Sequence, residues 1–514
     1  MVGWGSGYVT DIPYEEGFYP DQAPQRLALT AVLNGFEAPD LSRGFCYCEL
    51  GCGKGVTSTI LAAANPNAEF HAVDFNPAHI AHAQSISRAA EISNITWHET
   101  DFGALGRDGS DALPMFDFVT MHGIWSWIAP ELQDAIVRFL DRHLKPGGLL
   151  FVSYNAMPAW YAMVPVRRIL KELAASVPGP SNSAVSVAIR NLNRLRDAGM
   201  IPDCFEPSLK HLNEIAQRRW LTYLAHEYLN AYWTPTYHAD VVRALGAAKL
   251  DYVGSASLIR NFENFLLTEP QMTLLNEIAT PEIRSMLVDF SVGVSLREDV
   301  FVRGARAMHE KRRDKLLRDE TICLTRPAPS QFALHGPNDT VLRPHPEAYA
   351  LFFRMLGQRP RKIGELLALP ELPSTFNGSS VGIVSLLVGE GVAAQFHEPE
   401  NAAVVRCQKY NQAVEAREEM PMDRPVNIAS APLGSAFSLS PQEFELYMDL
   451  RRGEKPIASR LARHFDQRCR AAGGFPVIDG KTLEDPNAAL PVIERDYAAK
   501  IEHLIPIWHQ AGII

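Results

Sequence analysis

The stretch from Phe45 to Gly55 reads FCYCELGCGKG, and it predicts a strand that runs into a glycine turn and then a helix. Such a turn lets the backbone approach a ligand closely and points helix N–H groups toward that ligand. The glycines stand at positions 51, 53 and 55, so their spacing differs from the G-x-G-x-x-G of a dinucleotide site. Lys54 is followed by Gly55 rather than by Ser or Thr, which excludes a P-loop. The turn therefore favours a ligand without phosphate groups.

Two acids near this turn narrow the ligand further. Glu49 lies two residues before the first glycine, where a carboxylate would repel a pyrophosphate and attract a cationic α-amino group. Asp74 ends an apolar run about 20 residues after the turn, the spacing at which a second strand brings an acid to a ribose diol. A nucleoside that carries an amino acid and no phosphate satisfies both acids. S-adenosylmethionine is such a molecule.

Strands and helices alternate along the first 305 residues. Asp101 and Phe102 follow the third strand, where a carboxylate would accept from an adenine amino group and a ring would cover the base. We expect strands at residues 45–50, 69–73, 95–98, 116–121, 149–154, 250–255 and 299–303. Strands that alternate with helices predict an α/β fold with a doubly wound, Rossmann-like, seven-stranded sheet.

These motifs resemble a known family, the class I S-adenosylmethionine-dependent methyltransferases. The resemblance rests on Glu49 to Gly53, Val73-Asp74, Asp101-Phe102 and the Lys-Pro-Gly-Gly turn at 145–148. Residues 7–14 (GYVTDIPY) and 122–127 (HGIWSW) are similar to a bacterial subgroup with a methyltransferase regulatory domain, which includes protein lysine methyltransferases of outer-membrane proteins. The class resemblance covers roughly the first third of the chain, and the subgroup resemblance weakens past residue 310.

The motifs and the resemblance together imply a set of residues at the cofactor S-adenosylmethionine. They lie in the N-terminal arm, in the glycine turn and after the second, third and fourth strands. The predicted cofactor-binding residues are Tyr8, Glu49, Gly51, Cys52, Gly53, Gly55, Asp74, Phe75, Asp101, Phe102 and His122. For Tyr8, which lies in the N-terminal arm, the alternative is that it only packs the arm onto the domain.

The candidate catalytic residues lie at the carboxyl ends of the central strands, where an open α/β sheet places its ligand. Methyl transfer is an in-line displacement in which positioning supplies much of the rate, so we look for dipoles and aromatic walls. The candidates are Tyr14, His122, Trp125, Tyr154, Asn155 and Glu227. Each has a structural alternative, such as a capping, core or surface role. For Trp127 we favour the structural role, sealing a helix against the sheet.

The chain length of 514 residues predicts several domains. We expect an N-terminal arm (1–44), a methyltransferase domain (45–305) with helical insertions at about 177–222 and 256–298, and a linker helix (306–339). A winged-helix-like module (340–410) and a helical tail region (411–514) would follow, with loops at 424–435. The module offers no Arg or Lys on its third helix, so we expect protein or substrate docking there rather than DNA reading.

The net charge and the cysteines limit which partners and which cell compartment we expect. The formal net charge of −10 argues against a nucleic-acid substrate. The seven cysteines are odd in number and scattered, so we expect free thiols in a reducing cytosol, acting as small apolar fillers, and no metal site. We see no signal peptide and no apolar run of membrane-spanning length, and we expect a cytoplasmic protein, with a homodimer as the candidate assembly.

The combined hypothesis is an enzyme that N-methylates lysine side chains of a protein or peptide, with the later modules recognising that substrate. One alternative is O- or N-methylation of a glycan or small metabolite. A second alternative is an inactive methyltransferase fold with a regulatory role.

Overall fold

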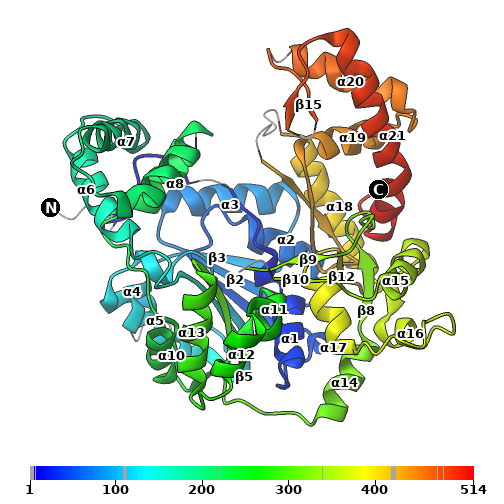
Figure 1. The fold of residues 1–514 in the computed structure, drawn as a ribbon, viewed down its shortest axis with the longest axis horizontal. Helices are drawn as coiled ribbons and strands as arrows, with labels where there is room; N and C mark the ends of the chain where they lie inside the picture. The colour runs from blue at the N-terminus through cyan, green and yellow to red at the C-terminus, as the bar shows by residue number, and fades with distance from the viewer. Residues whose placement is uncertain are drawn as a thin grey trace.

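The computed structural model describes residues 5, 7–14, 16–107, 113–218, 220–337, 340–417, 424–471, 473–478 and 480–514. Its centre is a seven-stranded sheet in the order β3-β2-β1-β4-β5-β7-β6 (Figure 1). The strands are β1 (Cys46–Leu50), β2 (Glu69–Asp74), β3 (Ile95–Glu99), β4 (Phe116–Met121), β5 (Leu144–Asn155), β6 (Leu250–Ser255) and β7 (Leu296–Arg303). β7 runs antiparallel to both of its neighbours, β5 and β6, whereas the other neighbouring strands of this sheet pair in parallel. The predicted Rossmann-like fold is confirmed.

Helices cover both faces of the sheet, because its central strands are apolar on both sides. Phe118 and Val119 are neighbours on β4, yet they belong to different hydrophobic clusters, as the alternation of a strand requires. One face packs against α1 (Pro24–Leu33) and α2 (Val56–Ala64), and the other against α5 (Pro130–His143) and α10 (His238–Gly246). The helices α3 (Pro77–Ala89) and α4 (Phe102–Leu105) complete the layers.

A helical lobe stands beside the carboxyl edge of the sheet (Figure 1). It has its own core, to which Ile12 of the N-terminal arm contributes. The lobe consists of α6 (Met163–Ala175), α7 (Ser181–Asp197), α8 (Glu206–Gln217) and α9 (Leu221–Tyr228). It therefore begins before the predicted insertion at residue 177. The second excursion contains α11 (Glu263–Leu266), α12 (Glu269–Leu275) and α13 (Pro281–Val292).

A small mixed module follows α14 (Glu310–Asp319). The predicted edge strand near residue 391 is β12 (Ala393–Gln395), and it pairs with β8 (Thr321–Leu324) from the segment predicted as a linker. The other elements are β9 (Leu334–His335), β10 (Val341–Leu342), α15 (Pro346–Gln358), β11 (Arg361–Lys362), α16 (Ile363–Leu367), α17 (Ser380–Ile383) and a π-helical turn (Val384–Val388). The winged-helix-like arrangement stays a prediction.

The C-terminal region packs directly on the domain that carries the sheet. Helix α18 (Asn401–Glu415) contacts α2 and α3, and one hydrophobic cluster runs from Ala23 to Ile513. The predicted loop at 424–435 is wrong in part, because Val426–Ser430 forms one strand of a hairpin. The elements are α18 (Asn401–Glu415), β13 (Val426–Ser430), β14 (Ser435–Leu439), α19 (Pro441–Arg451), α20 (Ala458–Ala471), β15 (Val477–Ile478), β16 (Lys481–Thr482) and α21 (Pro486–Gln510).

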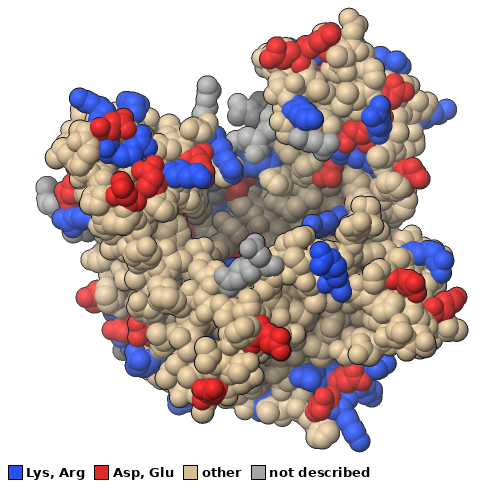
Figure 2. Space-filling model, in the orientation of Figure 1, with Lys and Arg blue, Asp and Glu red and all other residues tan. Residues whose placement is uncertain are grey.

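The face in Figure 2 is hollowed between the helical lobe and the C-terminal helices. Among the described residues, no helix is both long enough and apolar enough to cross a membrane.

Candidate active site

A cavity of about 400 Å³ lies at the carboxyl ends of β1 to β4, the place where a doubly wound sheet binds its ligand. The glycine turn, the ends of three strands and the N-terminal arm all contribute to its wall. Of the predicted cofactor-binding residues, those that line it are Tyr8, Gly51, Gly53, Asp74, Phe75, Asp101, Phe102 and His122. The structure therefore brings together residues that are widely separated in the sequence.

Asp74 fixes the shape of the glycine turn. One of its carboxylate oxygens accepts a hydrogen bond from the backbone N–H of Gly53 at 2.9 Å, and the other accepts from the N–H of Asn76 at 2.9 Å. The ring nitrogen Nδ1 of His79 lies 3.2 Å from the second oxygen. Asp74 is thus a buried acid that joins the first strand-to-helix turn to the second, at the wall of the cavity.

The turn itself requires glycine. Gly51 has a φ of +75° in the left-handed region, and a Cβ at this position would lie 2.2 Å from Cδ1 of Ile124. Gly55 has a φ of +76° and precedes α2. Its added Cβ would meet the ring of Trp97 at 2.4 Å, so this glycine serves the packing of α2 rather than the cavity wall.

Glu49 lies beneath the cavity and does not line it. The Ser58 hydroxyl donates to one of its oxygens and the Gln22 amide donates to the other at 3.3 Å. Burial raises the pKa of Glu49 to about 7. Cys52 is also buried off the cavity, in a small cluster with Ala72 and Ile80. Of the predicted cofactor contacts, Glu49, Cys52 and Gly55 thus support the turn from behind.

The N-terminal arm closes one side of the cavity. Tyr8 and Tyr14 both line it, and the Tyr8 ring meets the edge of Phe75 with ring centroids 5.9 Å apart. The Tyr14 ring packs edge-on against His226 at 5.0 Å. Burial raises the pKa of Tyr14 well above its ordinary value, so its hydroxyl stays protonated at neutral pH.

His122 is a buried, neutral wall of the cavity. Its ring stacks on Tyr19 with centroids 3.7 Å apart, and its Nδ1 lies 3.2 Å from the Ser153 hydroxyl. Burial lowers the pKa of His122 to about 4, so the ring carries no charge at neutral pH. This residue can position a ligand, but it has no proton to donate as an imidazolium.

Glu227 lies just behind the aromatic side of the cavity, on α9. Its Oε1 accepts from the Asn155 amide at 3.1 Å and from the indole N–H of Trp233 at 3.2 Å. The indole N–H of Trp127, a residue of the cavity wall, donates to the Glu227 backbone carbonyl at 3.3 Å. Burial raises the pKa of Glu227 to about 6. Its charge is close enough to raise the pKa values of both Tyr8 and Tyr14.

Two family models match this chain within the sheet and its insertions. Residues 48–150 match the model described as a methyltransferase domain, and residues 221–303 match the model described as a predicted methyltransferase regulatory domain. The strand order and the glycine turn agree with the first match. Residues 48–150 of this chain form a methyltransferase domain. The predicted resemblance to methyltransferases with a regulatory domain is confirmed.

Solved structures and curated proteins extend the comparison. PKMT2 from Rickettsia typhi in complex with AdoHcy has a TM-score of 0.69 at 17% identity, covering 95% of this chain and 98% of that chain. A second PKMT2 structure gives 0.66 at 17% identity, covering 96% and 99%. At this identity the likeness shows a shared fold.

Two curated relatives are uncharacterized proteins. One from Synechocystis is 35% identical over 306 residues, 59% of this chain and 60% of its own length. One from Rickettsia prowazekii is 31% identical over 172 residues, 32% of this chain and 30% of its own. The matches therefore span less than two thirds of either relative.

The two tryptophans that follow β4 are placed opposite to the prediction. Trp125 is 1% exposed and sits in the core cluster with α5, whereas Trp127 lines the cavity. Both lie in one short helical turn (Trp125–Trp127) after β4. Because the turn is irregular, the sequence does not reveal which ring faces the ligand.

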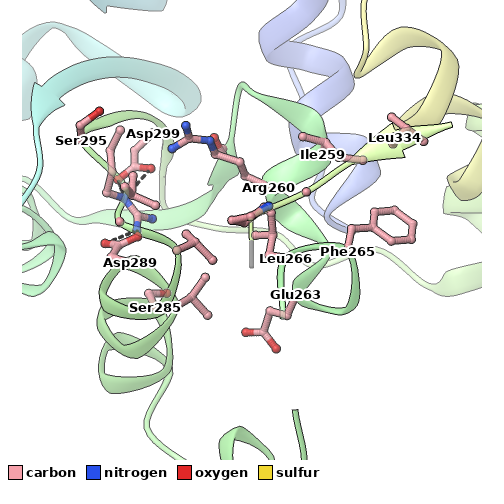
Figure 3. Close-up of a pocket in the computed structure, with 18 of the residues that line it drawn as sticks. Ile259, Arg260, Glu263, Phe265, Leu266, Ser285, Asp289, Ser295, Asp299 and Leu334 are labelled. Atoms are coloured by element: carbon pink, nitrogen blue, oxygen red, sulfur yellow. Dashed lines mark hydrogen bonds and ion pairs between the residues drawn. The ribbon is translucent and has the colours of Figure 1, made fainter. Parts of the chain in front are cut away.

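The prediction that Tyr154 is catalytic also has to be corrected, because its hydroxyl points away from the cavity. It donates to Asp299 at 2.6 Å and lies 3.1 Å from Nδ1 of His238. Asp299 in turn pairs with Arg297, which also pairs with Asp289. This network borders a second cavity of about 380 Å³, walled mainly by residues 252–299 of the regulatory domain (Figure 3). The neighbouring Asn155, by contrast, reaches Glu227.

Several wall residues of the first cavity were not predicted. Glu99 ends β3 and Thr100 follows it, and this place at the carboxyl end of a strand is a signal that could have found both residues. Tyr232 follows the helical lobe, and only the tertiary fold brings it to the cavity. The remaining additions are Gly5, His79, Gly123, Ile124, Ile128, Ala129 and Leu132.

Proposed function

We propose that this chain transfers the methyl group of S-adenosylmethionine to the side-chain nitrogen of a lysine in a protein or peptide. The observation that carries the proposal is Glu227, a buried carboxylate with a raised pKa behind the aromatic wall of the cavity. A lysine amine has to lose a proton before it attacks a methyl group. A carboxylate whose pKa is raised toward neutrality is a better proton acceptor than an ordinary one.

The cavity suits the cofactor. Asp74 offers a carboxylate for a ribose diol, Asp101 offers one for an adenine amino group, and Phe102 offers a ring for the base. The glycine turn, with Gly51 and Gly53 in the cavity wall, lets the backbone approach the amino-acid part of the ligand. A likeness to PKMT2, a protein solved with AdoHcy, supports this choice.

The reaction needs few groups from the protein. When bound, S-adenosylmethionine supplies a methyl group on a sulfonium, which departs as a neutral thioether. Glu227 accepts the proton of the lysine ammonium, and the freed nitrogen lone pair forms the new N–C bond. Asn155 and Trp233 hold Oε1 of Glu227 in place. The positioning of amine and methyl carbon in line supplies much of the rate.

The aromatic wall favours a cationic acceptor. Tyr8, Tyr14 and Trp127 line the cavity, and Tyr232 lies at its exposed side, with 42% of its surface accessible. Ring faces attract an ammonium group before it is deprotonated. The negative charge of Glu227 adds to this attraction for a cationic acceptor.

A labelling screen tests this function. The purified protein receives S-adenosylmethionine carrying a radioactive methyl group and an extract of its host, split by size. We expect label in a discrete protein band, lost with Asp74→Ala and kept with Asp240→Ala, whose side chain is 51% exposed on α10. Label only among small molecules would reassign the acceptor to a metabolite or glycan. No label in any fraction would favour a binding role without catalysis.

A further inference from the structure

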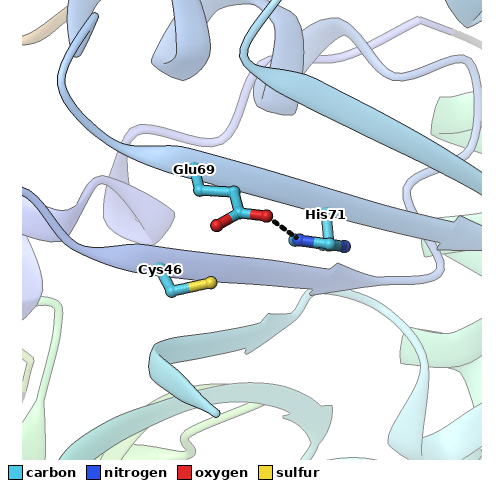
Figure 4. A group of neighbouring side chains, drawn as sticks. All are labelled: Cys46, Glu69 and His71. Atoms are coloured by element: carbon cyan, nitrogen blue, oxygen red, sulfur yellow. Dashed lines mark hydrogen bonds and ion pairs between the residues drawn. The ribbon is translucent and has the colours of Figure 1, made fainter. Parts of the chain in front are cut away.

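A second set of chemically reactive side chains lies at the opposite edge of the sheet from the cofactor cavity. Cys46 begins β1, Glu69 begins β2, and His71 follows on β2 (Figure 4). The Cys46 thiol, a Glu69 carboxylate oxygen and a ring nitrogen of His71 all lie within 4.8 Å of one another. Among the described residues, these three side chains form the group of His, Cys, Asp and Glu that lie close enough together to hold a metal ion.

The strand register creates this cluster. Cys46 is paired with Glu69 in the parallel ladder, and Cys48 is paired with His71. Paired residues in neighbouring strands project from the same face, and residues two apart on one strand share that face. Cys46, Glu69 and His71 are therefore held on one face by the backbone of the sheet itself, so their approach does not depend on a flexible loop.

The donor types suit zinc. Thiolate sulfur, imidazole nitrogen and carboxylate oxygen are its ordinary ligands, at about 2.0–2.3 Å from the ion. Cys46 is 8% exposed and His71 is 6% exposed, whereas the Glu69 side chain is 64% exposed. The buried pair would hold the ion, and the exposed carboxylate gives it a path from solvent.

A neighbouring histidine supports His71 as a ligand. The Nε2 of His71 faces Glu69 at 3.0 Å, and its Nδ1 lies 2.9 Å from Nε2 of His98 on β3. With a metal on Nε2, His71 carries its proton on Nδ1 and donates it to His98. Metal-bound histidines ordinarily make such a bond, which fixes the tautomer and orients the ring.

We propose that Cys46, Glu69 and His71 form a zinc site, with water in the fourth position, that ties the start of β1 to the start of β2. Binding displaces the thiol proton of Cys46, because the thiolate is the form that ligates metals. This assignment revises the sequence-based expectation of no metal site and of Cys46 as an apolar filler. It is independent of the acceptor that the enzyme methylates.

Titration of the full-length, chelator-treated protein with zinc chloride alone tests the site. We expect one equivalent to bind, the melting temperature to rise, and protons to be released to the buffer. Cobalt chloride in place of zinc should give a sulfur-to-cobalt charge-transfer absorption, which identifies a thiolate ligand.

Three variants separate the site from nonspecific binding. Glu69→Gln changes an exposed side chain, so the fold is retained, and we expect it to weaken zinc binding at least about tenfold. Cys46→Ala should abolish the charge-transfer absorption. Cys48→Ala removes a thiol from the same strand and should bind zinc like the wild type. Equal affinity in all four proteins, or no saturable binding by the wild type, would overturn the proposal and leave a row of hydrogen bonds from Glu69 through His71 to His98.

Discussion

Burial changes the chemistry of single residues in this active site, with opposite consequences for acids and bases. Burial disfavours the charged form of any group, so it raises the pKa of Glu227 to about 6 and lowers that of His122 to about 4. Glu227 is consequently ionised at neutral pH but ready to take a proton. His122 is neutral and acts through its shape, stacked on Tyr19.

Replacing the acid tests its role as proton acceptor. We expect Glu227→Gln to lower kcat about 100-fold, the scale of general-base catalysis, because the amide cannot take the proton of the lysine ammonium. The dissociation constant of S-adenosylmethionine should stay unchanged. The matched control is Glu172→Gln, whose side chain is 60% exposed on α6. A kcat within twofold of the wild type for Glu227→Gln would remove this residue from the reaction.

The pH dependence gives a second test of the same group. Below about pH 6 Glu227 becomes protonated, so kcat/KM should fall about tenfold per pH unit as acid is added. This acid limb should be absent from the Glu227→Gln profile. A wild-type profile that is flat between pH 5 and pH 7 would show that this carboxylate does not need its charge.

Sequence reasoning worked best at residues fixed by a local motif. Asp74, Asp101, Gly51 and Gly53 lie at the cavity because the position of each depends on one strand and the turn that follows it. The predictions for Trp125, Tyr154 and Trp127 differ from their positions in the structure. The direction of a side chain at a strand end depends on packing partners that are distant in the sequence. Asp299 of β7, for example, draws the Tyr154 hydroxyl away.

At the scale of elements, the glycine turn after β1 is the most constrained connection of the site. It carries left-handed glycines at 51, 53 and 55, and Asp74 ties it to the end of β2. The turn can therefore present its backbone to a ligand without rearranging. The expected strands of the sheet were found since apolar runs bounded by turns are a strong signal. β13 was missed because its sequence, VNIAS, is short and half polar.

Adding one methyl group to this turn should impair binding. In Gly51→Ala the new Cβ would meet Ile124 at 2.2 Å, so we expect the isoleucine to shift into the cavity and the cofactor to bind at least about tenfold more weakly, or ~1.4 kcal/mol. Calorimetric titration with S-adenosylmethionine measures this change.

The control shares the backbone strain but not the contact. Gly304 has a φ of +69° and open space around its Cβ position, so Gly304→Ala should lose about 1 kcal/mol of stability and bind the cofactor normally. Equal cofactor affinity in both variants would show that Gly51 matters only for backbone conformation.

At the scale of the whole molecule, Glu16 joins three parts of the chain. Its carboxylate pairs with His82 of α3 at 3.0 Å, with Arg417 after α18 at 2.8 Å and with Lys54 of the glycine turn at 3.6 Å. The His82 hydrogen bond and the two cations hold the pKa of Glu16 well below its usual range. The arm that covers the cavity is thereby fastened to the C-terminal region. Sequence reasoning could not find this junction, because Arg417 lies 401 residues from Glu16 in the chain.

Loosening this junction should speed cofactor exchange. We expect Glu16→Gln to raise the dissociation rate of S-adenosylmethionine several-fold in stopped-flow measurements, since the arm opens more often. Glu37→Gln removes another ion pair between distant parts of the chain, the one with Arg312, and should leave that rate unchanged. The stabilisation by Glu16 is present at neutral pH and is lost as the pH falls below about 4.5, the unfolded value. An unchanged dissociation rate would mean that the arm does not gate the cavity.

The chemical identity of the methylated group decides the central claim. A host protein labelled with a radioactive methyl group is hydrolysed to amino acids, and the label is separated by chromatography against methylated standards. We predict that the label elutes with Nε-methylated lysine and survives treatment with alkali. Label released by alkali as methanol, as from a carboxyl methyl ester, or label on any other residue would contradict the account.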